Sequence, residues 1–284
     1  MSIVITGATG QLGRHVISCL LRLDVQIPDI VAAGRNEEKL GSLAELDLRT
    51  ARIDYDDPAS LDDAFEGAGT VLMISGSEVG RRVAQHTNAI EAAKDAGVGL
   101  IAYTSILKAD TSSLLLAEEH LATEKALAGS GIAYVLLRNG WYIENYTGQL
   151  PVYLEHGIAG AAGDGQVSAA TRADYAEAAA AVLAGDGHAG AVYELGGEPF
   201  TMTGLADAVS AATGRTVSYT DLPVEQYAAV LVGAGLPEPV AAVFADGDRG
   251  VAEGELFTDG NDLEKLIGRA PTSLTDALTA ATRA

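Results

Sequence analysis

Short apolar runs and amphipathic helical segments alternate along the first half of the chain. The run from Ser2 to Thr6 precedes a segment in which Leu12, Val16 and Leu20 recur at helical spacing. Similar runs predict six strands, at about residues 2–6, 29–33, 51–54, 70–75, 99–105 and 132–138. The periodicity between them predicts helices at about residues 58–66, 80–96 and 114–129. This alternation is typical of the α/β class, and it indicates a Rossmann-type, doubly wound parallel sheet with helices on both faces.

The second half of the chain is less regular and predicts a smaller lobe. Its helical segments lie at about residues 172–183, 201–213 and 223–234, and its strands at about 191–195 and 216–220. The tail is mostly helical in pattern, and no internal repeat or long linker separates two units. We therefore divide the chain into a Rossmann domain at residues 1–150 and a smaller α/β C-terminal lobe at residues 151–284. This boundary is nominal, because we expect the second lobe to thread back onto the first.

A glycine-rich turn joins the first predicted strand to the first helix. It reads Gly7-Ala8-Thr9-Gly10-Gln11-Leu12-Gly13. Gly7 permits the sharp turn, Gly10 lets the backbone approach a pyrophosphate, and Gly13 lets the helix pack closely. The N–H groups at the helix start favour phosphates. The spacing is Gly-x-x-Gly-x-x-Gly and no Gly-Lys-Ser/Thr triplet follows, so the loop predicts a dinucleotide site rather than an ATP-type loop.

The end of the second strand indicates which dinucleotide binds. An acidic residue there would hold the ribose 2′-hydroxyl of NAD, but this chain has Ala33-Gly34-Arg35-Asn36 instead. The Arg35 guanidinium suits a 2′-phosphate, so we expect NADPH, with NADH binding more weakly. The alternative is that Arg35 is an exposed loop residue or stacks on the adenine. Asp54 is a candidate acceptor for the adenine amino group, and a plain surface turn is the alternative there.

The general acid of ordinary short-chain dehydrogenases is missing from this chain. These enzymes use a Tyr-x-x-x-Lys pair, and none of the ten tyrosines here has a lysine four residues later. The segment from Glu118 to Gly131 resembles the pattern around that lysine, with His120 in the lysine position and Leu116 in the tyrosine position. His120 is therefore a candidate proton source or ribose contact, and a neutral core or surface histidine is the alternative.

Composition and charge argue against several other classes. The net charge of −21 opposes nucleic acid and anionic membranes, and local cations and helix-end amides must offset it where a dinucleotide binds. The five histidines are scattered without a His-Glu-x-x-His motif, so we expect no metal. Cys19 is the single cysteine, which excludes an internal disulfide. The apolar runs are too short to cross a membrane and the chain begins directly with a strand, so we expect a cytoplasmic protein.

These motifs together resemble a known family, the NmrA-like atypical short-chain dehydrogenases. The resemblance covers nearly the whole chain. It is carried by Ile5–Gly13, Ser75–Gly80, Ile101–Ser105, Leu137–Tyr142, Ala161–Gly165, Ala170–Tyr175, Leu266–Gly268 and Pro271–Thr272. Within the family, quinone-reducing members match more closely than triphenylmethane-dye reductases, which differ in the strand-four loop and after Asn139.

The resemblance implies which residues hold the cofactor. The glycine loop and Arg35 would bind the adenosine and phosphates, the loop after strand four would line the groove, and Asn139 to Glu144 would meet the nicotinamide. The implied set is Gly7, Ala8, Thr9, Gly10, Gln11, Leu12, Gly13, Arg35, Asp54, Ser75, Gly76, Ser77, Glu78, Tyr103, Thr104, Asn139, Gly140, Trp141, Tyr142 and Glu144. Gly76 stands where the family pattern has serine, which puts a side-chain contact there in doubt.

The resemblance also implies the reaction, which is NADPH-dependent two-electron reduction of a quinone by direct hydride transfer without flavin. A hydroquinone anion is stabilised by its ring, so water or a weak donor can protonate it, and a dedicated tyrosine is not needed. Trp141, Tyr142 and Tyr146 are the candidates for stacking the quinone, with lobe packing as the alternative for Trp141 and Tyr146. Tyr142 and His120 are the candidate catalytic residues.

Two other functions stay open at this point. One is an NAD(P)-binding redox sensor that regulates a protein partner without turnover. The other is a reductase of different conjugated acceptors, such as triphenylmethane dyes. The sequence is also compatible with a homo-oligomer.

Overall fold

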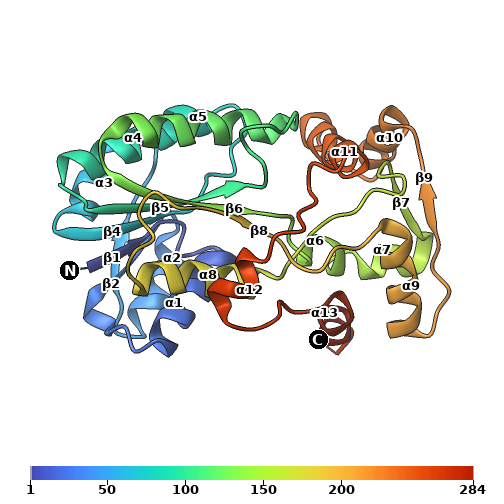
Figure 1. The fold of residues 1–284 in the computed structure, drawn as a ribbon, viewed down its shortest axis with the longest axis horizontal. Helices are drawn as coiled ribbons and strands as arrows, with labels where there is room; N and C mark the ends of the chain where they lie inside the picture. Colours follow the sequence, from blue (N-terminus) through green and yellow to red (C-terminus); the bar gives the residue numbers. More distant parts are fainter. Residues whose placement is uncertain (1, 284) are drawn as a thin grey trace.

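Seven parallel strands form the central sheet of this computed structural model, which describes residues 2–283 (Figure 1). The strand order is β3-β2-β1-β4-β5-β6-β8, and each neighbouring pair is parallel. The strands are β1 (Ser2–Ile5), β2 (Ile30–Gly34), β3 (Arg49–Arg52), β4 (Ala68–Met73), β5 (Leu100–Ile106), β6 (Ala133–Asn139) and β8 (Val192–Leu195). The order reverses between β1 and β4, which is where doubly wound sheets open a crevice for ligands.

Helices cover both faces of the sheet, as the apolar pattern predicts (Figure 1). One face is covered by α1 (Gln11–Arg22), α2 (Glu37–Ala44), α8 (Arg172–Ala184) and α12 (Asp262–Ile267). The other is covered by α3 (Pro58–Phe65), α4 (Arg82–Asp95) and α5 (Leu115–Ser130). The buried stripe of α1 includes Val16 and Leu20, which are fully covered by the sheet and α8. The α/β fold class is thereby confirmed.

A second lobe lies beyond the carboxyl ends of the strands, at the right of Figure 1. It has its own apolar core, which includes Ile143, Leu205 and Val251. Its elements are α6 (Glu144–Thr147), α7 (Leu150–His156), β7 (Ile158–Gly160), α9 (Met202–Thr213), β9 (Tyr219–Asp221), α10 (Val224–Gly233), α11 (Glu238–Ala252) and α13 (Leu274–Ala281). Strand β8 and helices α8 and α12 return to the first lobe, so residue 150 marks only a nominal boundary.

The structure differs from the predicted elements in several places. Helix α2 was not expected, although Asn36 caps it through a 2.8 Å hydrogen bond from the Lys39 N–H, and two acids occupy its first turn. Helix α4 begins at Arg82 rather than near residue 80, because the preceding residues form a loop. The strand expected at 216–220 corresponds to β9. The short elements α6, α7 and β7 were not predicted, because their hydrophobic residues show no clear helical or strand periodicity. Among residues 2–283, no helix is long and apolar enough to cross a membrane.

Candidate cofactor and acceptor site

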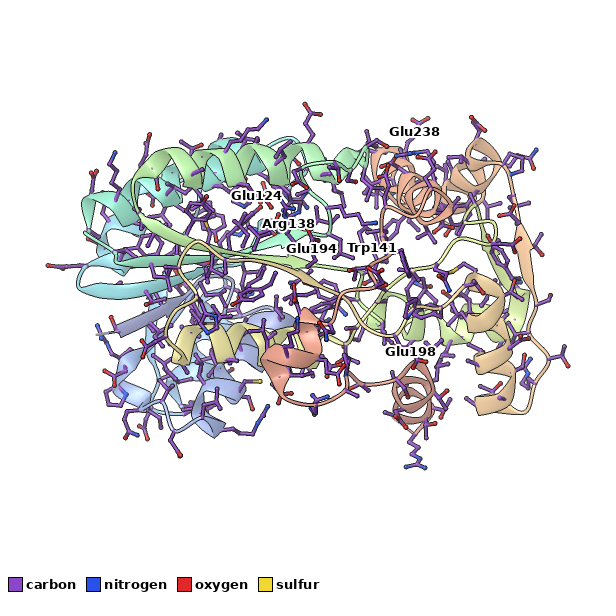
Figure 2. All side chains as sticks on the ribbon, in the orientation of Figure 1. Glu124, Arg138, Trp141, Glu194, Glu198 and Glu238 are labelled. Atoms are coloured by element: carbon purple, nitrogen blue, oxygen red, sulfur yellow. The ribbon has the colours of Figure 1, made fainter. Side chains whose placement is uncertain are left out.

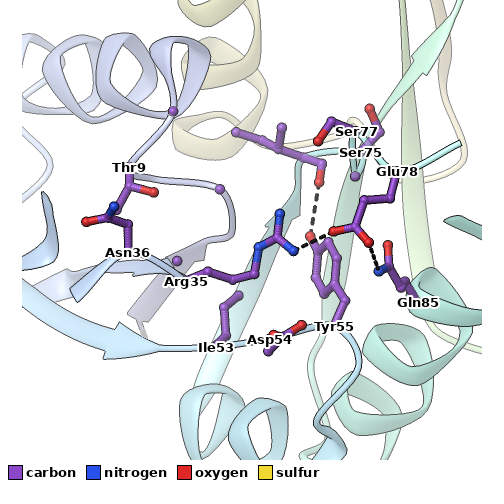
Figure 3. A pocket seen from close by; sticks show the side chains of 15 residues that line it. Thr9, Arg35, Asn36, Ile53, Asp54, Tyr55, Ser75, Ser77, Glu78 and Gln85 are labelled. Carbon is purple, nitrogen blue, oxygen red and sulfur yellow. Dashed lines mark hydrogen bonds and ion pairs between the residues drawn. The ribbon is translucent and has the colours of Figure 1, made fainter. Parts of the chain in front are cut away.

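A cavity of about 370 Å³ opens at the carboxyl ends of β1, β2 and β4, at the point where the strand order reverses (Figure 3). It is lined by Gly7, Thr9, Gly10, Gly34, Arg35, Asn36, Ile53, Asp54, Tyr55, Ile74, Ser75, Gly76, Ser77, Glu78 and Gln85. Eleven of these residues come from the glycine loop, the end of β2 and the loop after β4, so the cavity unites three regions separated in sequence. Its volume and position suit part of a dinucleotide.

The glycine loop has the tight geometry that its sequence predicts. Gly7 has a φ of +62°, which favours glycine, and the Gly10 N–H closes the turn on the Gly7 carbonyl oxygen at 2.9 Å. A Cβ atom at Gly13 would lie 2.5 Å from the Gly7 oxygen and 2.6 Å from the Ala8 Cα, so no side chain fits there. Gly10 is the N-cap of α1 and supplies no capping side chain, and the first turn carries no acid. The N–H groups at this helix end are therefore available to an anion.

Arg35 follows β2 and lines the cavity, as expected, but its guanidinium is already paired. Its Nη1 atom lies 2.5 Å from Glu78 Oε1, and this hydrogen bond is the main cause that raises the pKa of Arg35 (Figure 3). The Arg35 side chain is 57% exposed and that of Glu78 is 33% exposed. Two residues predicted to act separately on the cofactor therefore meet each other across the cavity.

Asp54 and Tyr55 form the side of the cavity that follows β3. Asp54 lines the cavity, while its Oδ1 accepts a 3.1 Å hydrogen bond from the Asp56 N–H and closes a turn. Both readings of Asp54 are therefore compatible with the structure. Tyr55 was not predicted; its hydroxyl lies 2.6 Å from Thr6 Oγ1 and 3.0 Å from the Ile74 carbonyl oxygen, joining this turn to β1 and the end of β4. Nothing in the local sequence around Tyr55 indicates this role, because its hydrogen-bond partners lie far away along the chain.

The loop after β4 is held by its backbone rather than by its side chains. The Ser75 N–H donates to Thr104 Oγ1 at 2.9 Å, and the Gly76 N–H donates to His86 Nε2 at 3.0 Å. Arg82 Nε donates to the Gly76 carbonyl oxygen from the first turn of α4. Since Nε2 accepts, His86 carries its proton on Nδ1 and donates it to a threonine of α5. Thr104 thus positions the cavity wall without lining it, and Ser77 lines the cavity on the exposed side.

His86 on α4 and His120 on α5 are both buried, and both are neutral at physiological pH. Burial lowers the pKa of His86 to about 4 and that of His120 to about 3, and the nearby Arg82 lowers both further. His120 Nδ1 lies 2.7 Å from the hydroxyl of Tyr103, whose side chain is fully buried. Neither Tyr103 nor His120 lines the cavity. The structure thus favours the core-histidine alternative, and contact of these two residues with a ligand stays a prediction.

Asn139, at the end of β6, has a buried side-chain oxygen that accepts no hydrogen bond from the described part of the chain. Asn139 is 6% exposed, and its Oδ1 is the one buried side-chain nitrogen or oxygen without a hydrogen-bond partner within residues 2–283. An unpaired buried acceptor costs roughly 1–3 kcal/mol, so this atom favours a ligand with an N–H donor. A Cβ atom at the next residue, Gly140, would lie 2.6 Å from the Ser168 carbonyl oxygen, so glycine is required there by packing.

Tyr142 and Glu144 contact the start of α8. The Arg172 guanidinium carbon lies 4.2 Å from the centroid of the Tyr142 ring, and the Glu144 carboxylate accepts the Arg172 N–H at 2.9 Å. Burial raises the pKa of Tyr142, so its hydroxyl keeps its proton at neutral pH. Glu144 therefore accepts a backbone N–H in the first turn of α8, whose N-cap is Thr171, and its predicted contact with the nicotinamide would be additional to that role.

Trp141 and Tyr146 lie at the junction with the second lobe. Trp141 is half-buried between the end of the sheet and α11 (Figure 2), where its ring comes within 3.2 Å of a Cβ atom built on Gly247. Tyr146 is 8% exposed and makes a T-shaped contact with Phe200, with ring centroids 5.5 Å apart. Both rings pack against the second-lobe core, which supports the packing alternative for both residues, although Trp141 is less buried than Tyr146. Their contact with a quinone stays a prediction.

No group of three or more His, Cys, Asp or Glu side chains within residues 2–283 is arranged to hold a metal ion.

Comparison with known proteins identifies the class first. The model of the NmrA-like family matches residues 1–279, so this chain belongs to that family, as the sequence motifs predict. The chain is 51% identical over 278 residues to Quinone oxidoreductase 2 of Escherichia coli (strain K12), and the match covers 97% of each chain.

Solved structures agree with this assignment. A crystal structure of the NADPH-dependent quinone oxidoreductase of Escherichia coli, complexed with NADPH, has a TM-score of 0.96, 50% identity and 99% coverage of both chains. The triphenylmethane reductase of Citrobacter sp., complexed with NADP(H), has a TM-score of 0.94 at 39% identity and covers 99% of this chain and 100% of its own. The whole architecture, including the second lobe, is therefore shared with oxidoreductases of this family.

Proposed function

We propose that this protein is an NADPH-dependent quinone reductase that transfers hydride directly, without flavin. The observation that carries the proposal is the pairing of a cavity at the sheet's switch point, walled by the glycine loop, with an arginine after β2. The 51% identity to a quinone oxidoreductase over nearly the full length supports the acceptor class. The proposal accounts for both the presence of the glycine loop and the absence of a Tyr-x-x-x-Lys pair.

The residues present fit NADPH from one end to the other. The α1 N-terminus and the glycine loop would hold the pyrophosphate, where Gly13 allows close approach. Arg35 would bind the 2′-phosphate, and Asp54 and Tyr55 would bound the adenine side of the cavity. At the other end, the unpaired Asn139 Oδ1 would accept an N–H of the nicotinamide carboxamide.

When bound, NADPH supplies a hydride from its nicotinamide ring to the acceptor. The residues of the chain then act by position rather than by acid catalysis. Trp141, exposed in part beside the second lobe, would stack the flat acceptor and exclude water from one of its faces. His120 is neutral, so it would not donate a proton as an imidazolium. Protonation of a resonance-stabilised hydroquinone anion by water suffices for the proposed reaction.

Turnover by the purified, flavin-free protein tests the proposal. NADPH oxidation would be followed by its loss of absorbance with 1,4-benzoquinone, with malachite green and without acceptor, and NADH would be run in parallel. We expect quinone-dependent oxidation that is faster with NADPH than with NADH. Saturable NADPH binding without turnover on either acceptor would favour a redox sensor, and turnover of the dye alone would assign the protein to the dye reductases.

A further inference from the structure

The charges around Arg35 are unfavourable for a phosphate as they stand. Arg35, Asp54 and Glu78 line the cavity here, and Arg81 and Asp56 lie behind them, so two guanidinium groups face three carboxylates. A 2′-phosphate adds a charge of about −1.5 to −2 at neutral pH. The group placed to repel it most is Glu78, because that carboxylate already holds the Arg35 Nη1 atom that the phosphate needs.

A second set of partners for Glu78 is present on α4 and just before it. The other carboxylate oxygen, Oε2, lies 3.4 Å from Gln85 Nε2 and 3.6 Å from Arg81 Nη1. Figure 3 shows Glu78 between the Arg35 guanidinium on one side and Gln85 on the other. The Glu78 side chain can therefore turn away from Arg35 and keep a donor and a cation. The backbone of this loop need not move, because His86 and Arg82 hold Gly76.

We propose that Glu78 is a specificity-determining residue that competes with the 2′-phosphate of NADPH for Arg35. NADPH binds by displacing Glu78 toward Arg81 and Gln85. NADH, which has no 2′-phosphate, binds while Glu78 still neutralises Arg35, and the same carboxylate can accept a hydrogen bond from the ribose 2′-hydroxyl. Glu78 thus reduces the preference for NADPH over NADH that Arg35 alone would give. This inference rests on the proposed assignment of Arg35 to the 2′-phosphate.

The test compares Glu78→Gln with the unmodified protein by calorimetric titration of two ligand pairs. The pairs are NADPH with NADH, and adenosine 2′,5′-bisphosphate with adenosine 5′-monophosphate, so that each pair differs by the 2′-phosphate. An exposed ion pair is worth about 0.2–1 kcal/mol, which corresponds to a gain of up to about fivefold. We expect Glu78→Gln to bind the 2′-phosphorylated ligands about two- to fivefold more tightly and to bind NADH no better than before.

A matched control separates this effect from a general change in charge. Glu253 forms an ion pair of the same 2.5 Å length with Arg249 in the second lobe, and Glu253→Gln removes the same charge. It should leave the NADPH-to-NADH affinity ratio unchanged. In an Arg35→Ala background, Glu78→Gln should no longer favour the 2′-phosphorylated ligands, because the guanidinium for which Glu78 and the phosphate compete is absent.

The outcomes distinguish the two proposals. If Arg35→Ala weakens NADPH selectively but Glu78→Gln leaves the affinity ratio unchanged or lowers it, the role of Glu78 is refuted and the cofactor assignment stands. If Arg35→Ala weakens NADPH and NADH equally, the assignment of the 2′-phosphate to Arg35 fails, and the competition proposed here fails with it.

Discussion

Arg138 and Glu124 form a two-pronged ion pair inside the protein, with Arg138 Nε 2.9 Å from Glu124 Oε1 and Nη2 2.6 Å from Oε2. Both residues are more than nine-tenths buried. The same guanidinium reaches Glu194 on β8 at 2.9 Å, and Ser105 on β5 donates to Glu124 at 2.6 Å (Figure 2). The cluster therefore ties three strands and α5 together directly beside Asn139, at the end of the sheet where the nicotinamide is expected.

Replacing Arg138 should destabilise the protein strongly. Arg138→Ala leaves the Glu124 carboxylate buried without a cation, and breaking such a pair costs about 3–5 kcal/mol. The free energy of unfolding from urea denaturation measures this. Lys265→Ala is the matched control, because Lys265 pairs with Asp262 on the surface and is 64% exposed, so its loss should change the free energy by under about 0.5 kcal/mol. Equal losses in the two variants would contradict a structural role for the buried pair.

Gly13→Ala should damage both the fold and cofactor binding. The new Cβ would meet backbone atoms of Gly7 and Ala8 at 2.5–2.6 Å, so the loop must shift, at a cost of about 1–3 kcal/mol. We expect NADPH affinity to fall at least about tenfold, measured by titration. Gly41→Ala is the control: it lies on α2 with open space around its Cβ position and should stabilise the protein by up to about 1 kcal/mol. Wild-type affinity in Gly13→Ala would show that the close approach is unimportant.

Arg35→Ala should weaken NADPH binding by about 10- to 100-fold, because a charge-assisted hydrogen bond of about 1.5–3 kcal/mol is lost. NADH affinity should change less than about threefold. Arg52→Ala removes the same charge from the end of β3, where Arg52 pairs with Glu37 outside the cavity, and should affect neither cofactor. Titration of both cofactors with each variant gives the comparison.

Trp141→Ala should raise KM for quinone several-fold while sparing NADPH affinity. Stacking on the acceptor is lost, whereas Trp141 does not line the cavity at the switch point of the sheet. Trp141→Phe should recover most of the loss, since an aromatic ring still packs toward Gly247. Steady-state kinetics with varied quinone are the measurement. Unchanged quinone kinetics in Trp141→Ala would remove this residue from the acceptor site.

Acid should loosen the loop after β4 through His86. Its pKa is about 4 in the folded protein and near 6.5 when unfolded, so the unfolded chain binds more protons between these values. Stability therefore falls as the pH drops from 6.5 toward 4, by about 1–2 kcal/mol for His86 at pH 5. Burial raises the pKa of Asp248 to about 6, which acts in the opposite direction, so a variant is needed to isolate His86.

The variant His86→Gln supplies that comparison, because a glutamine oxygen can still accept from the Gly76 N–H. The free energy of unfolding would be measured at pH 7.5 and pH 5 for both proteins. We expect His86→Gln to lose less stability on acidification than the unmodified protein. An identical loss in both would mean that the pKa of His86 in the folded protein is not lowered below its value in the unfolded chain.

The sequence predicted those features that depend on neighbours along the chain. The strands were found because buried parallel strands are continuous apolar runs, and the glycine spacing gave the turn geometry that Gly7 and Gly13 adopt. The position of Arg35 at the end of β2 also followed from the order of the elements. The family resemblance then implied the extent of the site. The comparisons of the whole chain support the family and the activity, and the individual site residues stay predictions.

Other features depend on contacts between distant segments, and periodicity carries no signal for them. Tyr55 meets Thr6 across 49 residues, and Gly76 meets a histidine that no motif singled out. His120 was singled out by its alignment with a catalytic lysine, yet burial of its side chain on the inner side of α5 makes it neutral. The counter-ion of Arg35 was also not foreseen, because Glu78 was considered only as part of the groove and not for its charge.

The return of β8 to the sheet makes the two lobes inseparable. A fragment ending at residue 150 would leave the backbone groups of β6 from Leu136 to Asn139 without their hydrogen-bonding neighbour, and it would uncover the α1 stripe that α8 buries. A bare, apolar edge strand invites pairing with other chains. Such a fragment should aggregate rather than serve as a nucleotide-binding module, so changes to the second lobe are best made by substitution within the intact chain.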